Sequence, residues 1–250
     1  MKQENRIHVG TSGWNYPHWR GPFYPPELPT REWLRYYTGK LHTVEINNSF
    51  YRLPEKKTFE SWRESAPPNF IFSVKASRYI THMKKLKDTE KPLTTFLDRV
   101  AGLGDKAGPI LFQLPGGWNY DKDRLEKFLK SLPEGFRYTM ELRNSTWWNP
   151  EVYQLLNQYG VAFCIFEIGG VMSPIEITAD FIYLRLHGPG EKYQGCYDEQ
   201  TLKQWAETFF SWRAQNKDVF CYFDNDQRGY AARNALELQN LITNSLGPEA

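Results

Sequence analysis

The chain has 250 residues, with 31 basic side chains against 29 acidic ones. This balance excludes a global electrostatic field as the basis of nucleic-acid or anionic-membrane binding. No stretch approaches the ~20 apolar residues of a membrane-spanning helix, and the polar start, Met1 to Arg6, lacks the apolar core of a signal peptide. We therefore expect a cytoplasmic protein with no membrane partner. Three cysteines without a CxxC pair argue against disulfides and thiolate-bound zinc.

Strand and helix signals alternate along the whole chain. We predict strands at 7–10, 43–47, 70–75, 109–114, 137–142, 161–166, 181–186 and 218–223, and helices at 31–38, 56–64, 92–103, 121–132, 150–159, 198–215 and 228–244. Residues 169–180 are too few and too rich in Pro and Gly for an ordinary helix, so the sixth helix should be missing or reduced. The pattern predicts an α/β fold, a TIM-type (β/α)8 barrel that forms one domain over residues 1–250.

A doubly wound open sheet is the alternative fold. It fits less well, because Gly10–Trp14 lacks the third glycine and the short turn of a phosphate-binding fingerprint.

Six of the predicted strands turn polar at alternate positions as they end. Because strand side chains alternate between the two faces, these polar residues share one face and the apolar residues share the other. Active sites of parallel barrels lie at the carboxyl ends of the strands, so we expect the polar set to converge there. The set comprises Glu45, Lys75, Gln113, Glu141, Arg143, Arg185, His187 and Asp224.

Matched acids and bases at such a site favour acid/base chemistry on an anion. We predict Glu45, Glu141, His187 and Asp224 as catalytic residues, with the two glutamates as an acid/base pair and His187 as the proton carrier. Lys75, Arg143 and Arg185 are predicted to bind the anion, because guanidinium and ammonium groups suit phosphate or carboxylate.

The same charges are compatible with a metal site or with a purely structural role. No cofactor is required and we assign no metal ligands, but a divalent metal held by Glu45, Glu141, Asp224 and His187 is an alternative. The charges could also form a buried salt-bridge plug that only stabilises the barrel.

Loops contribute further candidates for substrate binding. His82 lies in a basic segment with Arg78, Lys84, Lys85 and Lys87, which is typical of a solvated surface and would also suit phosphate contacts. Many aromatic residues fall in predicted loops, where rings often line ligand clefts. The predicted substrate-binding residues are completed by Trp14, Asn47, Tyr51 and Gln113.

Several motifs together resemble the YecE-like family, bacterial domain of unknown function 72. They are Val9-Gly10-Thr11-Ser12-Gly13-Trp14, Phe23-Tyr24-Pro25, Val44-Glu45-Ile46-Asn47-Asn48-Ser49-Phe50-Tyr51-Arg52, Ile80-Thr81-His82, Phe112-Gln113-Leu114-Pro115, Glu141-Leu142-Arg143, Leu184-Arg185-Leu186-His187-Gly188 and Phe223-Asp224-Asn225-Asp226. The resemblance covers nearly the whole chain and implies a β/α barrel without naming a substrate. Asp224 stands where the family pattern more often has Asn, so a base or metal role there transfers less well.

These observations favour a cytoplasmic barrel enzyme that acts on a small anionic compound, phosphorylated or sugar-like, at an anion-binding pocket. The reaction class is left open between a hydrolase and an isomerase or lyase, and the oligomeric state is not predicted. The alternatives are a nucleic-acid binding or processing protein, and a non-catalytic module that binds a small ligand.

Overall fold

Two compact units make up the chain. The computed structural model describes residues 6–246, so residues 1–5 of the polar start lie outside the described part. The first unit comprises Met1–Val44, Ile165–Ser173 and Phe181–Ala250, and the second comprises Glu45–Cys164 and Pro174–Asp180. The expectation that all 250 residues form one domain stays a prediction.

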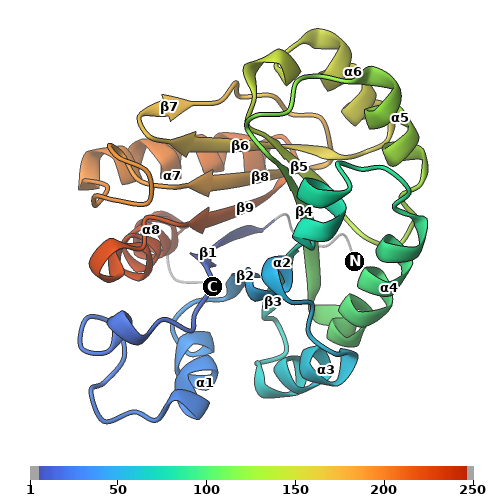
Figure 1. Ribbon diagram of the computed structural model, residues 1–250. Coiled ribbons are helices and arrows are strands. Elements are labelled where there is room, and N and C mark those ends of the chain that lie inside the picture. Colours follow the sequence, from blue (N-terminus) through green and yellow to red (C-terminus); the bar gives the residue numbers. More distant parts are fainter. Residues whose placement is uncertain (1–5, 247–250) are drawn as a thin grey trace. The chain divides into compact units, whose positions relative to one another are not determined.

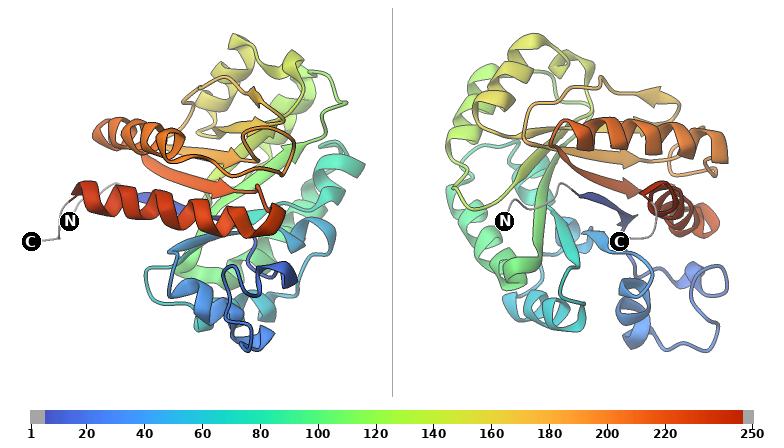
Figure 2. Two further views of the ribbon diagram at one scale, coloured as in Figure 1. Left: turned by 90° about the vertical axis from the view of Figure 1, so that its left-hand side faces the viewer. Right: turned by 180° about the vertical axis from the view of Figure 1, so that it is seen from behind.

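The first unit is built on three parallel strands. Strand β9 (Asp218–Phe223) pairs with β1 (Ile7–Ser12) on one side and with β8 (Phe181–Leu186) on the other. Three helices accompany them: α1 (Trp33–Thr38), α7 (Glu199–Ala214) and α8 (Tyr230–Leu246). Figure 2 shows α7 and α8 lying side by side along these strands. Gly10 allows β1 to approach β2 closely, because a Cβ atom there would lie 2.1 Å from the Thr43 carbonyl oxygen.

The second unit contains the next three parallel strands and the helices that follow them. Its strands are β3 (Ile71–Lys75), β4 (Ala107–Leu114) and β5 (Tyr138–Leu142). Its helices are α2 (Asn48–Tyr51), α3 (Lys56–Ser65), α4 (Glu90–Val100), α5 (Lys122–Lys130) and α6 (Pro150–Gln158). Asn149 caps α6 by accepting a hydrogen bond from the Val152 N–H, and Pro150 occupies the first turn, where its missing N–H is tolerated.

Strands β2 (Thr43–Ile46) and β6 (Ala162–Ile168) each have residues in both units. The strand order is β5-β4-β3-β2-β1-β9-β8-β6, and β5 also pairs with β6 through Thr139 and Met140 (Figure 1). This order of eight parallel strands, with helices between most of them, is that of a TIM-type (β/α)8 barrel. The predicted fold class is confirmed, and the open sheet is excluded because its edge strands would not pair.

The expected loss of the sixth helix is also confirmed. Residues 169–180, all within the described range, contain no helix. A short antiparallel strand, β7 (Val171–Met172), instead folds back on the end of β6. The turn between them is Gly169-Gly170, and both residues have positive φ, which glycine adopts without strain. Because this pairing extends β6 to Ile168, the strand ends two residues later than its apolar run predicted.

The helix boundaries lie within three residues of their predictions, and the largest difference is at the third predicted helix. The helix expected at 92–103 begins at Glu90 and ends at Val100, and residues Ala101–Lys106 continue as a 3-10 helix. Gly104 lies within that turn at φ 54° and ψ −127°, a conformation that ends helical geometry. Within the described residues, no helix is both long and apolar enough to cross a membrane.

Candidate functional site

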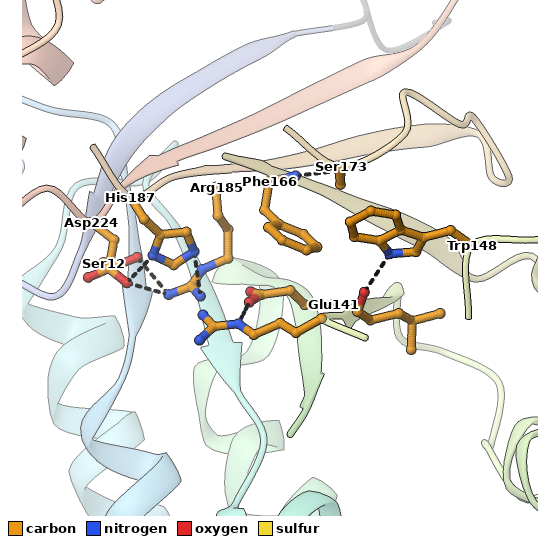
Figure 3. Close-up of polar contacts among 10 residues, drawn as sticks. Ser12, Glu141, Trp148, Phe166, Ser173, Arg185, His187 and Asp224 are labelled. Carbon is orange, nitrogen blue, oxygen red and sulfur yellow. Dashed lines mark hydrogen bonds and ion pairs between the residues drawn. The ribbon is translucent and has the colours of Figure 1, made fainter. Parts of the chain in front are cut away.

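Four polar side chains meet at the strand ends of the first unit, and we call them the arginine–histidine cluster: Ser12, Arg185, His187 and Asp224. Arg185 Nη2 lies 3.0 Å from Asp224 Oδ2 and 3.2 Å from Ser12 Oγ (Figure 3). Arg185 and His187 are fully buried, while the Asp224 side chain keeps 16% of its exposure. Alternation along β8 explains why Arg185 and His187 share a face.

His187 is oriented by its neighbours on both ring nitrogens. Its Nε2 lies 3.3 Å from Arg185 Nη1, and its Nδ1 lies 3.0 Å from Asp224 Oδ2. Because a guanidinium can only donate, Nε2 accepts and the imidazole proton is assigned to Nδ1, facing the carboxylate. A carboxylate behind an imidazole fixes its tautomer and stabilises its protonated form, so this cluster is chemically able to hold and release a proton.

A second acid of the first unit lies two residues further along. Asp226 accepts hydrogen bonds from Trp19 Nε1 and, at 3.0 Å, from His18 Nε2. Burial raises the pKa of its carboxyl to about 6, although the bonds from Trp19 and His18 act in the opposite sense. Asp226 was not among the predicted site residues.

In the second unit, strand pairing places polar residues side by side. Phe112 packs on Phe128 of α5, with ring centroids 4.9 Å apart, so the adjacent Gln113 points to the opposite face of β4. Gln113 is in register with Glu141 of β5. Glu141, labelled in Figure 3, is fully buried and forms an ion pair with Arg143 Nε. The Arg143 side chain keeps 18% of its exposure.

The segment after β2 contacts the end of β3. Ser49 Oγ donates to the Lys75 carbonyl oxygen at 2.6 Å, and the Lys75 ammonium lies 4.6 Å from the centre of the Phe50 ring. The same ring meets His82 edge-on, with centroids 5.0 Å apart. Phe50 therefore links a lysine and a histidine that are seven residues apart in sequence.

We call Lys75, Arg78, His82, Glu141 and Arg143 the cationic cluster. Desolvation lowers the pKa of His82 below its usual 6.5, and the positive charges of Lys75, Arg143 and Arg78 lower it further. Of the groups that act on this pKa, only Glu141 raises it. His82 is consequently held neutral near pH 7.

Thr81 determines which ring nitrogen of His82 carries the proton, and so which nitrogen can accept one. Its Oγ1 lies 2.9 Å from His82 Nδ1 and 3.4 Å from the Ser77 carbonyl oxygen. With the hydroxyl donating to that carbonyl, Nδ1–H donates to Thr81 and the lone pair lies on Nε2. His82 then presents Nε2 as a base.

The remaining predicted residues differ in their surroundings. Glu45 is fully buried in β2, and Asn47 has a buried Oδ1 for which the described residues offer no hydrogen-bond donor. Tyr51 is 75% exposed, with its ring against Phe50 at 5.0 Å. Trp14 accepts a hydrogen bond from Tyr24 through its carbonyl oxygen. The structure brings Arg185, His187 and Asp224 together in one unit, and Lys75, His82, Glu141 and Arg143 in the other.

Sequence reasoning missed two further side chains that are able to exchange protons or donate hydrogen bonds. Thr81 belongs to the Ile80-Thr81-His82 motif, but its hydroxyl was given no role. Glu167 follows the apolar run of β6, and this is the same strand-end signal that identified the other sites. Burial raises the pKa of Glu167, against the effect of a hydrogen bond from Tyr197. No group of three or more His, Cys, Asp or Glu side chains suited to a metal ion occurs in the described part of the chain.

Comparisons with known proteins agree on one family. The family model described as "Protein of unknown function DUF72" matches residues 8–249. The UPF0759 protein YunF of Bacillus subtilis is 26% identical, over 94% of each chain.

Solved structures give the same result. A DUF72 family protein from Thermotoga maritima superposes with a TM-score of 0.86 at 27% identity, over 95% of this chain and 99% of its own. A DUF72 family protein from Enterococcus faecalis has a TM-score of 0.81 at 22% identity, over 94% and 95%. The resemblance deduced from the motifs is thus confirmed, and the chain belongs to the DUF72 family.

Proposed function

We propose that the protein is an enzyme that binds a small anionic compound, phosphorylated or sugar-like, at the cationic cluster and exchanges a proton with it through His82. One observation carries the proposal: three cations act on His82, and a single carboxylate, Glu141, opposes them. Three cations around one imidazole favour an anion, because each attracts negative charge and the arginine forks fit phosphate or carboxylate oxygens.

The residues of the cluster have separable roles. Lys75 and Arg78 supply charge, and Arg143 supplies a planar donor fork that suits phosphate or carboxylate. The ion pair through Nε orients the Arg143 guanidinium on a buried carboxylate. We keep Glu45 and Glu141 as the proposed acid/base pair of carboxylates, with the reaction class open between hydrolysis and isomerisation or elimination.

Anion binding and proton transfer reinforce each other at His82. Before binding, desolvation and the cations keep the imidazole neutral, so Nε2 can accept a proton. A bound anion offsets the cations and raises the pKa of His82, which favours the protonated imidazole that proton abstraction produces. The site therefore becomes a better base when it is occupied.

The test begins with a thermal-shift screen of phosphosugars, hydroxy acids, inorganic phosphate, nucleotides and divalent metals. A ligand at 100 times its dissociation constant adds about 2.7 kcal/mol to the unfolding free energy, which is a shift of several degrees for a chain of this size. Compounds that bind are then incubated with the protein, and product formation is followed by NMR.

Variants separate binding from chemistry. Arg78→Gln should weaken the shift caused by the anion, whereas Lys57→Gln, an exposed charge change on α3, should leave it unchanged. His82→Gln should keep binding and reduce turnover about 100-fold or more, as expected when a general base is removed. Full turnover in His82→Gln would refute the catalytic role, and a shift that survives Arg78→Gln would refute the anion site.

In the first unit, we retain His187 as a proposed proton carrier. The contact of Asp224 with its Nδ1 supports this role. Because Nε2 is in contact with Arg185, proton transfer at Nε2 requires that contact to open. His187→Gln should therefore reduce turnover without altering the thermal shift caused by inorganic phosphate, and unchanged turnover would remove this role.

A second candidate function is binding of single-stranded nucleic acid. Tyr51 and Tyr79 of the second unit are 75% and 42% exposed, and basic residues Arg52 and Arg78 adjoin them in sequence. Exposed rings beside basic side chains suit base stacking with backbone contacts. This function predicts oligonucleotide affinity that falls steeply with salt and is lost in Tyr51→Ala.

A further inference from the structure

A groove on the surface of the second unit shares no lining residue with the cationic cluster. It lies where the segment before α4 and the first turn of that helix face the last turns of α5, and its volume is about 630 Å³. This is within the usual range for small-ligand sites. The lining residues are Tyr79, Lys84, Leu86, Asp88, Thr89, Glu90, Lys91, Pro92, Lys127, Phe128, Lys130 and Ser131.

The groove carries positive charge on both of its walls. Lys84 and Lys91 belong to the wall before and at the start of α4, and Lys127 and Lys130 belong to α5. Two acids, Asp88 and Glu90, lie on the first wall only. The α5 wall is therefore purely basic among the lining residues, and the groove as a whole has two cations in excess.

The protein itself does not neutralise all these lysines. Elsewhere in this unit, Lys56 of α3 pairs with Asp98 at 3.0 Å. Lys130 pairs with Glu126 at 2.6 Å. Among the described residues, no carboxylate lies within ion-pair distance of Lys91 or Lys127, which belong to opposite walls of the groove. Their charges are available to an anion.

The wall that precedes α4 has an unusual backbone. Lys85, Leu86 and Asp88 have φ angles of 46°, 62° and 45°, in the left-handed region that side chains other than Gly, Asn and Asp seldom adopt. Such conformations persist where the surrounding structure holds them, and they are frequent at ligand clamps. Here they bring Leu86 into the groove and place Lys84 5.8 Å from the centre of the Tyr79 ring.

We propose that this groove is a second anion-binding site, which takes a linear oligophosphate group. An anion with several charges is favoured over a singly charged one, because four lysines from two separate segments line the groove. Ammonium groups bind phosphate oxygens as point charges without a fixed fork, which suits a flexible chain of phosphoryl groups.

The same segment contributes to two sites. Arg78 and His82 belong to the cationic cluster, whereas Tyr79 and Lys84 line the groove. Lys75, Glu141 and Arg143 are not among the lining residues. The proposed groove site is consequently independent of the proposed catalytic site, and each can be removed without altering the residues of the other.

The test measures binding of inorganic triphosphate and of ATP to the full-length protein by calorimetry at low and at physiological salt. The double variant K91Q/K127Q removes two charges that have no carboxylate partner among the described residues. It should weaken triphosphate binding about tenfold, as expected for two partly exposed charge contacts. The control K57Q/K203Q makes the same change in net charge on α3 and α7, and should bind like the wild type.

The two probes distinguish the source of the oligophosphate. Equal loss for triphosphate and ATP assigns the site to the phosphate chain, and a greater affinity for ATP that Tyr79→Ala removes assigns it to a nucleotide. An equal loss in the control, or no binding at millimolar triphosphate, would overturn the proposal. So would binding that Arg78→Gln abolishes and K91Q/K127Q leaves intact, because the anion would then lie in the cationic cluster.

Discussion

The two partners of the Glu141–Arg143 ion pair differ in burial. We therefore predict that replacing Arg143 costs more stability than replacing Glu141. Glu141 is fully buried, whereas 18% of the Arg143 side chain is exposed. Arg143→Met would leave a carboxylate without its ion pair and away from water, and such a loss costs about 3–5 kcal/mol. Glu141→Gln would leave Arg143, whose side chain keeps 18% of its exposure, and an amide oxygen that still accepts its hydrogen bond, so we expect a smaller cost of about 1–3 kcal/mol.

Thermal unfolding measures the two changes. For a chain of this size, 1 kcal/mol corresponds to about 2–4 °C in Tm, so Arg143→Met should lower Tm by roughly 6–20 °C and Glu141→Gln by clearly less. The double variant carries neither charge, and its loss should be smaller than the sum of the single losses by about 1–3 kcal/mol.

A matched pair on the surface serves as the control. Lys203 and Glu199 of α7 form an ion pair at 2.6 Å, with 56% and 75% of their side chains exposed. The same substitutions there should change Tm little, because exposed pairs contribute little. If Arg143→Met destabilises no more than Lys203→Met, or less than Glu141→Gln, the Glu141 carboxylate is not desolvated as the structure shows.

Three further changes test the titrating groups. Because cations lower the pKa of His82, saturating inorganic phosphate should raise it, and a His82 ring-proton shift that titrates identically with and without phosphate would contradict the anion site. Thr81→Val removes the acceptor at Nδ1, so ¹⁵N shifts should show the neutral ring moving towards the Nε2–H tautomer, unlike Thr95→Val on α4. The pKa of Asp226 is raised to about 6, so between about pH 4 and pH 6 the folded protein keeps this proton while the unfolded chain has lost it. The unfolding free energy of the wild type therefore falls as pH rises from about 4 to about 6. Relative to wild type, Asp226→Asn should gain up to about 3 kcal/mol between pH 4 and pH 7, and an unchanged difference in urea unfolding would refute the shift.

Alternation along the strands made much of the barrel predictable. Arg185 and His187 are two residues apart on β8, so any strand assignment places them on one face, and the same holds for Glu141 and Arg143 at the end of β5. The missing sixth helix was visible in Gly169-Gly170, because two adjacent glycines favour a tight turn. These features depend on local sequence alone.

What the sequence could not supply depends on contacts between distant segments. No spacing indicates that Phe50 lies between Lys75 and His82, since a loop after one strand must reach the end of another. The raised pKa of Asp226 likewise arises from burial in the folded chain, where the carboxyl meets Trp19, more than 200 residues away in sequence. The β7 pairing that lengthens β6 is a tertiary feature that the apolar run of the strand does not contain.

The same pattern of polar residues at strand ends produces two clusters that differ in how carboxylates and cations are matched. In the arginine–histidine cluster, the Asp224 carboxylate contacts both Arg185 and His187, so the buried guanidinium has its counter-charge within the unit. In the cationic cluster, desolvation and the charges of three cations lower the pKa of His82, and one carboxylate, Glu141, opposes them. A guanidinium paired with a carboxylate suits a structural or proton-holding role, whereas three cations around one imidazole suit the binding of an anion. This difference, which residue types alone do not reveal, is the reason that the proposed anion site lies at Lys75, Arg78 and Arg143 rather than at Arg185.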